Sequence, residues 1–182
     1  MKNSVLIFTL AVSTLLSGCR KDEENGIEQT SKLIAKASNE IVATFASAAD
    51  LRASVEADEP IIFTGNDILW FDGATGEIRF RDNMANTNSL SLWRSVKFYI
   101  GDDYLFSSMI FVSDLSSAIY NSLVFYYSII ENKFYLADGY PMDTSVLSDP
   151  QKAQDERDDN MRKIENEWNK FITLMKQEEK YR

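Results

Sequence analysis

The sequence contains no histidine and a single cysteine, Cys19. The absence of histidine excludes a Ser-His-Asp triad, a Cys-His pair, and zinc or iron sites held by imidazole. One cysteine cannot form a disulfide within the chain, so packing must stabilise the fold. The sequence also lacks a glycine-rich phosphate loop, a dinucleotide fingerprint and a Ser-x-x-Lys motif. We therefore predict no metal and no cofactor, and we assign no catalytic residue.

Positive charge is also scarce. The chain has 19 lysines and arginines against 28 aspartates and glutamates, which gives a formal net charge of −9 at pH 7. Such an acidic chain repels the phosphates of nucleic acids and the headgroups of anionic membranes. The composition therefore predicts no nucleic-acid partner.

The longest apolar run lies at the N-terminus, from Val5 to Leu16, after the basic residue Lys2. This run is too short for a membrane-spanning helix, which needs about 20 residues. A short basic start followed by a short apolar stretch is typical of a cleaved export signal. We assign residues 1–18 to such a signal peptide.

The sequence Leu16-Ser17-Gly18-Cys19 resembles a bacterial lipobox, with an aliphatic residue and two small residues before the cysteine. The resemblance implies that Cys19 is the lipidation site, that the mature chain begins there, and that acyl chains attach it to a membrane. Two or more acyl chains are enough for stable anchoring.

The charged residues 20–24, "RKDEE", follow directly. They resemble the Lys-acid-acid export tag of small, uncharacterised surface lipoproteins of the Bacteroidetes type. That resemblance implies an outer-membrane lipoprotein exposed at the cell surface. The alternative is that residues 19–28 are only a charged, flexible tether.

Residues 29–182 are long enough for one domain. Apolar residues from Leu33 to Ala48 recur at intervals of four, which predicts an N-terminal helix. Within it, residues 41–45 also fit a strand. Alternating or continuous apolar segments predict strands over 61–63, 77–81, 95–100, 104–112, 123–130 and 133–136. For 68–71, a turn of helix and a strand both remain open.

The C-terminal region predicts a long helix. Asp149 before Pro150 fits an N-cap followed by proline at the first helical position. An apolar seam indicates that the helix docks on the sheet; it comprises Met161, Ile164, Trp168, Phe171 and Met175. The predicted fold is α+β, an antiparallel β-meander packed against an N-terminal and a long C-terminal helix.

Two stretches, "TGNDILWFDGATGEIRF" and "LVFYY…NKFYLADGYP", are similar to small secreted lipoproteins that occur in many copies in gut Bacteroidetes. The similarity implies an α+β domain. It implies nothing about a ligand or an activity.

Aromatic residues are the best candidates for a binding surface. Because both alternating faces of residues 123–130 are apolar, Tyr126 could form an exposed patch with Trp93 and Tyr99 if only one sheet face is covered. Four aspartates lie in predicted turns: Asp102, Asp103, Asp138 and Asp143. A turn aspartate either accepts hydrogen bonds from the backbone or, in a hydrolase, takes part in catalysis.

Three functions remain open from the sequence. The first is a lipid-anchored, non-catalytic binding or accessory module for a protein, peptide or glycan. The second is a small carboxylate-dependent hydrolase. The third is an inhibitor or immunity-type protein that meets a basic partner with its acidic surface.

Overall fold

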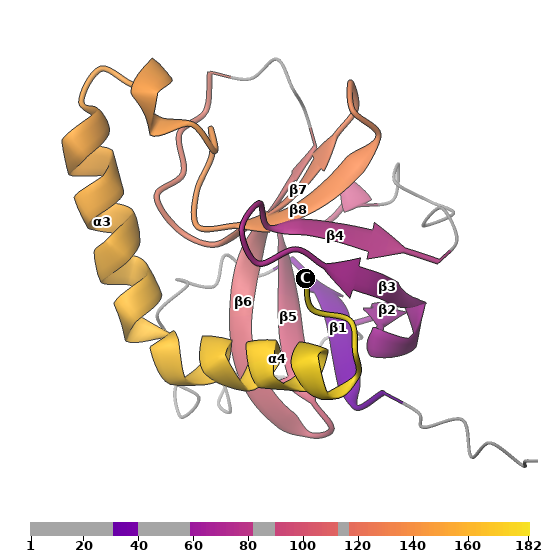
Figure 1. Cartoon of the computed structure of the whole chain (residues 1–182). Coiled ribbons are helices and arrows are strands. Elements are labelled where there is room, and N and C mark those ends of the chain that lie inside the picture. The colour runs from indigo at the N-terminus through magenta and orange to yellow at the C-terminus, as the bar shows by residue number, and fades with distance from the viewer. Residues whose placement is uncertain (1–30, 40–58, 82–89, 113–116) are drawn as a thin grey trace, which may run out of the picture.

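The computed structural model describes residues 31–39, 59–81, 90–112 and 117–182. Within these residues, eight strands form one sheet in the order β2-β1-β5-β6-β7-β8-β4-β3 (Figure 1). The strands are β1 (Leu33–Ser38), β2 (Ile61–Thr64), β3 (Ile68–Phe71), β4 (Glu77–Phe80), β5 (Ser95–Ile100), β6 (Asp103–Val112), β7 (Val124–Ser128) and β8 (Lys133–Ala137). Together with two C-terminal helices they confirm mixed α and β content.

The sheet is rich in antiparallel pairs but is not a simple meander. The predicted hairpins β5–β6 and β7–β8 are both present. However, β6 and β7 run parallel, with Met109 opposite Val124. A parallel pair requires a crossover rather than a tight turn. The hairpin β3–β4 lies beside β8, so sheet order departs from chain order as well.

The predicted N-terminal helix is wrong over Leu33–Ser38, which form β1 between β2 and β5. Leu33, Ala35 and Ala37 are fully buried, whereas the residues between them are partly exposed. Residues four apart share a side in a helix and in a strand, so the interval of four was ambiguous. The rest of the predicted helix, including residues 41–45, lies largely outside the described residues.

The two edge strands of the sheet, β2 and β3, are consecutive in the chain. Only the short 3-10 turn Gly65–Asp67 separates them. Because so short a connection keeps the two edges together, the sheet curls into a nearly closed barrel (Figure 1). The C-terminal tail pairs with β3, since the amide of Phe71 donates to the carbonyl of Lys180 at 2.7 Å. The tail therefore shields an edge that would otherwise be open.

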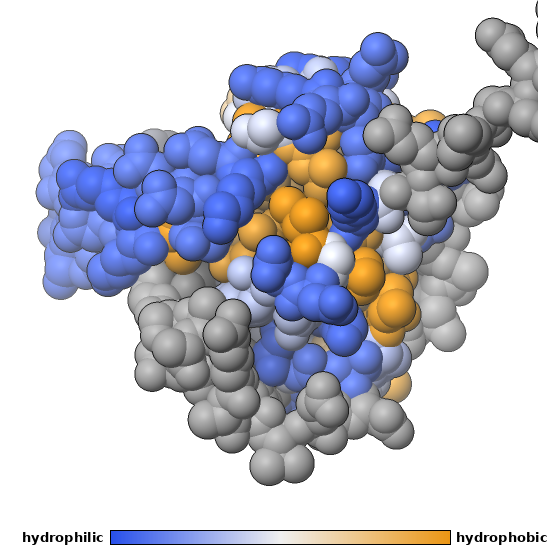
Figure 2. Space-filling model, turned by 90° about the horizontal axis from the view of Figure 1, so that it is seen from below, coloured by the Kyte–Doolittle hydropathy of each residue, from blue (hydrophilic) through white to orange (hydrophobic). Residues whose placement is uncertain are grey.

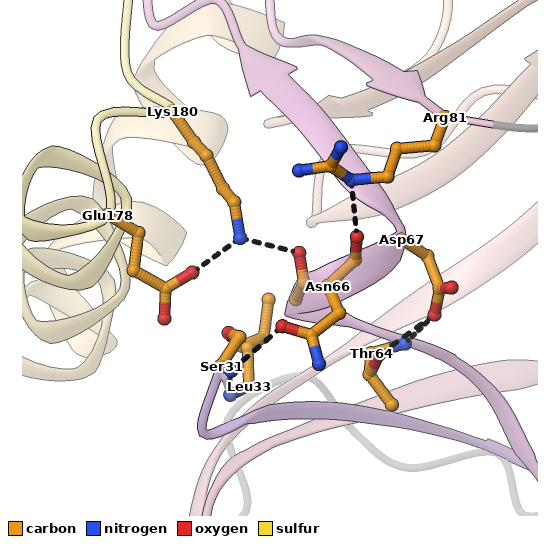
Figure 3. Close-up of polar contacts among 9 residues, drawn as sticks. Ser31, Leu33, Thr64, Asn66, Asp67, Arg81, Glu178 and Lys180 are labelled. Carbon is orange, nitrogen blue, oxygen red and sulfur yellow. Dashed lines mark hydrogen bonds and ion pairs between the residues drawn. The ribbon is translucent and has the colours of Figure 1, made fainter. Parts of the chain in front are cut away.

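Polar contacts hold this junction, as Figure 3 shows. The buried ammonium group of Lys180 donates to the carbonyl of Gly65 at 2.8 Å and also pairs with a neighbouring glutamate. Arg81 donates through Nε to the carbonyl of Asn66 at 2.8 Å. The Asn66 side chain accepts the backbone amide of Ser31 at 2.8 Å. One turn is thus joined to the C-terminal tail, to the end of β4 and to the residues before β1.

The C-terminal helix is present but is divided into α3 (Pro150–Lys163) and α4 (Glu165–Gln177). The predicted cap is confirmed, because the Asp149 side chain accepts the backbone amide of Lys152 at 3.1 Å. The helical path is interrupted at Ile164, where φ is −114° and ψ is 15°. The interruption allows α3 to stand beside the barrel while α4 crosses one end of it (Figure 1).

Phenylalanine side chains fill the interior of the barrel. Phe63 on β2 packs edge-on against Phe80 and Phe98, with ring centroids 5.0 and 5.9 Å apart. Phe125 on β7 stacks on Phe134 of β8 at 5.6 Å. Aromatic pairs of this geometry stabilise a core beyond the area that they bury.

Phe171 on α4 closes one end of this core. Its ring is fully buried and lies 5.3 Å from the ring of Phe71 and 5.8 Å from that of Phe106. Met175, one turn further along, is also fully buried. The predicted apolar seam therefore docks on the barrel.

Because α4 closes one end of the barrel, we call it the lid. The packing of Phe171 beneath the lid yields a stability prediction. Phe171→Ala removes a buried ring that contacts strands at both sides of the barrel, so it should lower the free energy of unfolding by about 3–5 kcal/mol in chemical denaturation. Thr173→Ala, at an exposed position on the same helix, is the matched control and should cost less than about 0.5 kcal/mol. Equal effects for the two variants would contradict the packing of α4 into the barrel.

Candidate functional site

The predicted lipidation site, Cys19, lies outside the described residues. The predicted patch residues Trp93, Tyr99 and Tyr126 are all described, but they do not form one exposed surface. Trp93 and Tyr99 are partly exposed, whereas Tyr126 is only 6% exposed. The ring of Tyr99 lies against Tyr104 at 5.7 Å, at the far end of β5 from Trp93. The expectation of a shared exposed patch is therefore wrong for Tyr126.

Tyr126 is buried because a second aromatic cluster covers the outer face of β7 and β8. Its ring packs against Tyr135 at 5.9 Å, against Tyr140 at 5.2 Å and against Phe111 at 5.8 Å. Both faces of β7 are thus covered. This coverage explains why β7 is apolar on both sides, whereas Ile129 and Ile130 beyond it are exposed.

The outer aromatic cluster is held in place from α3. Arg157 of α3 is 1% exposed and donates to the carbonyl of Pro141 at 2.9 Å. Burial lowers the pKa of its guanidinium group, and the charge of Asp138 at 4.0 Å partly offsets that effect. Gly139 is required beside it, since a Cβ there would lie 2.2 Å from Nε of Arg157 and 2.6 Å from the carbonyl oxygen of Tyr120. Arg157 also donates through Nε to Asn121 at 3.4 Å, so this buried side chain joins the loops that contain Asn121 and Pro141.

The four candidate carboxylates have different surroundings, and Asp138 lies beside Arg157. Asp143 accepts the amide of Ser145 at 2.8 Å and caps a short 3-10 turn. Asp102 and Asp103 are exposed at the turn between β5 and β6. Within the described ranges, no group of three or more histidine, cysteine, aspartate or glutamate residues lies close enough to hold a metal ion. Asp143 therefore has the backbone role of a turn residue.

An open groove of about 410 Å³ lies along α4, at the end of the barrel that this helix crosses. Its lining combines two apolar residues with amide, hydroxyl and ammonium groups: Lys32, Ile100, Asn166, Asn169, Lys170, Thr173, Leu174 and Gln177. Figure 2 views the molecule from this end and shows a strip of hydrophobic surface bordered by hydrophilic surface. We consider this groove the candidate functional site.

The polar wall of the groove is one face of α4. Asn166, Lys170, Thr173 and Gln177 recur at intervals of three and four, so they lie above one another along the helix. The buried Phe171 belongs to the opposite face. The helix thus has one face that docks on the barrel and one that is exposed to solvent.

The groove is electrostatically unusual for this protein. None of the described residues that line it is acidic, and two are lysines, although the chain as a whole carries a formal net charge of −9. The groove could not be predicted from local sequence patterns, because Lys32 and Ile100 are far from α4 in the chain. The available signal was the lack of aspartate and glutamate between Trp168 and Gln177.

No family model matches the chain, and neither a curated protein nor a solved structure matches it. In the part of the chain that the structure describes, no helix has the length and apolar character needed to cross a membrane.

The turn aspartates yield a prediction about pH. The pKa of Asp72 is lowered, chiefly because its carboxylate accepts the backbone amides of Thr75 and Ala74. A carboxylate with a lowered pKa in the folded state stabilises it above the unfolded value of about 3.9, and this contribution disappears as pH falls through the folded value. Asp72→Asn keeps the acceptor oxygen but removes the charge. Its denaturation midpoint should lie below that of the wild type at pH 7 and approach it at pH 3; a constant difference would contradict this role.

Proposed function

We propose that this protein is a lipid-anchored module of the cell envelope, exposed at the outer-membrane surface, that binds a partner without catalysing a reaction. The observation that carries the proposal is the groove along α4. Its polar groups are amides, a hydroxyl and ammonium groups, which position a ligand through hydrogen bonds and charge. No aspartate or glutamate lies among the described lining residues to serve as a catalytic carboxylate.

The interior of the barrel is filled with aromatic rings, which favours a binding site at the surface. The rings of Phe63, Phe98, Phe125 and Phe171 meet there, and each is at most 3% exposed. A ligand would have to displace these rings to enter. The groove outside the lid is therefore the better position for a partner.

The proposed anchor lies close to the groove along the chain. Lys32 lines the groove and directly precedes β1. Lys32 lies 13 positions after Cys19, and a chain of that length spans at most about 45 Å when fully extended. A lipid on Cys19 would therefore hold the groove within that distance of the membrane surface and favour partners that are themselves at the envelope.

Replacement of the proposed lipid acceptor tests the anchor. Cys19→Ala should leave folding intact and abolish membrane association, measured by fractionation of cells and by incorporation of labelled palmitate. Cys19→Ser is the closest control in shape and should behave like the alanine variant. Palmitate incorporation into either variant would contradict lipidation at Cys19.

Capture of partners from the native envelope tests the groove. Asn169→Asp and Gln177→Glu keep the side-chain shape but place negative charge in the groove, so the paired change should reduce recovery of bound partners about tenfold. Gln151→Glu, at an exposed position on α3, is the matched control and should leave recovery unchanged. The readout is quantitative mass spectrometry of the captured material.

Two other outcomes would show that the partner binds outside the groove. Loss of capture with Trp93→Ser or Tyr99→Ser, but not with the groove variants, would place it on the strand face. Capture that weakens steeply with salt and is lost when exposed acids of α3 are neutralised would favour an inhibitor or immunity-type function. Those acids are Asp155, Glu156, Asp158 and Asp159.

A further inference from the structure

We infer that the partner enters the groove as an extended peptide of about five residues that carries a carboxylate, either a side chain or a free C-terminus. This inference deepens the proposed function and rests on it. It follows from the spacing of the polar wall, from the apolar residues beside it and from the charge of the lining.

The spacing of the polar side chains on α4 suits an extended backbone. Asn169, Thr173 and Gln177 are successive positions four residues apart, which corresponds to about 6.0 Å along a helix. In an extended chain, groups on one side recur every second residue, about 6.6–6.8 Å apart. Amide and hydroxyl side chains both donate and accept, so they can pair with peptide N–H and C=O groups.

The length of the wall sets the length of the peptide. From Asn166 to Gln177 the helix rises about 16.5 Å. An extended chain covers that distance with about five residues. A longer ligand would continue beyond the groove at either end.

The apolar residues of the groove provide a place for alternate side chains. Ile100, at the end of β5, and Leu174, on α4, are both partly exposed and line the same groove. In an extended peptide, every second side chain points the same way. An aliphatic side chain directed toward Ile100 and Leu174 would lose water contact, while its neighbours would face solvent.

The charge of the lining indicates a carboxylate. Lys32 and Lys170 both line the groove and are exposed. Within the described residues, neither ammonium group has a hydrogen bond or an ion pair, and no acid lines the groove. A ligand carboxylate would therefore meet two cations that have no ion-pair partner among the described residues, and no described acid in the lining would compete with it.

The same lining argues against a glycan. The described lining residues include no aromatic side chain, so the groove offers no ring on which a sugar could stack. The partly exposed aromatics Trp93 and Tyr99 are not part of it.

A positional-scanning library of fluorescent pentapeptides, each with a free C-terminus, tests the inference on the full chain purified from membranes in detergent. Fluorescence anisotropy should select an aliphatic residue at one position and a carboxylate at another. N-methylation of alternate peptide amides in the selected sequence should weaken binding about tenfold, as expected for loss of a hydrogen bond. Methylation of the amides between them should have little effect.

Groove variants provide the matched comparison. Lys170→Ala and Lys32→Ala should each weaken binding of the selected peptide and leave binding of its C-terminal or side-chain carboxamide analogue unchanged. Lys152→Ala, at an exposed position on α3, should alter neither. Circular dichroism of each variant confirms that it is folded.

Failure of this inference is distinguishable from failure of the proposed function. If no pentapeptide pool binds, or binding is indifferent to Asn169→Asp and to Lys170→Ala, the peptide assignment is wrong. If partner capture still depends on the groove in that case, the binding function stands with another ligand class. Binding of neutral oligosaccharides at the groove, tested with a panel under the same conditions, would also overturn the peptide assignment.

Discussion

The packing of Phe171 against the rings of the barrel is the contact on which the rest of this structure depends. Its ring lies within 6.3 Å of those of Phe71, Phe98 and Phe106, so one side chain from α4 joins β3, β5 and β6. The chain has no internal disulfide and no imidazole-held metal to hold the end of the barrel closed. Burial of aromatic surface must therefore hold that end of the barrel closed. The same contact determines which face of α4 remains outside.

The segments before and after α4 also fix its position on the barrel. The interruption at Ile164 separates α4 from the acidic, largely solvated α3, and the buried Lys180 ties the chain after α4 to the turn between β2 and β3. A buried ammonium group without an acceptor would be costly, which favours the closed arrangement of the barrel edges. A groove on the outer face of a helix held in this way is preorganised, and a preorganised site binds a flexible peptide at a lower entropic cost.

Local patterns in the sequence predicted the features that depend on neighbouring residues. The hairpins β5–β6 and β7–β8, the cap at Asp149 and the seam through Phe171 follow from alternation, turn residues and helical spacing. The strand Leu33–Ser38 was misassigned because spacing by four fits both a helix and a strand. Local patterns could not predict contacts between segments that are distant in the chain. These contacts are the parallel β6–β7 pair, the cover over Tyr126, and the groove that combines Lys32 and Ile100 with α4.

Native-state hydrogen exchange of the backbone amides tests most directly the claim that α4 is an integral lid. If α4 is an integral lid, the amides near Phe171 and Met175 should exchange only when those of Val96 and Phe98 on β5 also exchange. Both sets should then show the same free energy of opening as global unfolding. Denaturant should affect both sets with the same slope. Exchange of α4 at a clearly lower free energy, while β5 remains protected, would contradict that claim, because the helix would then open independently of the barrel.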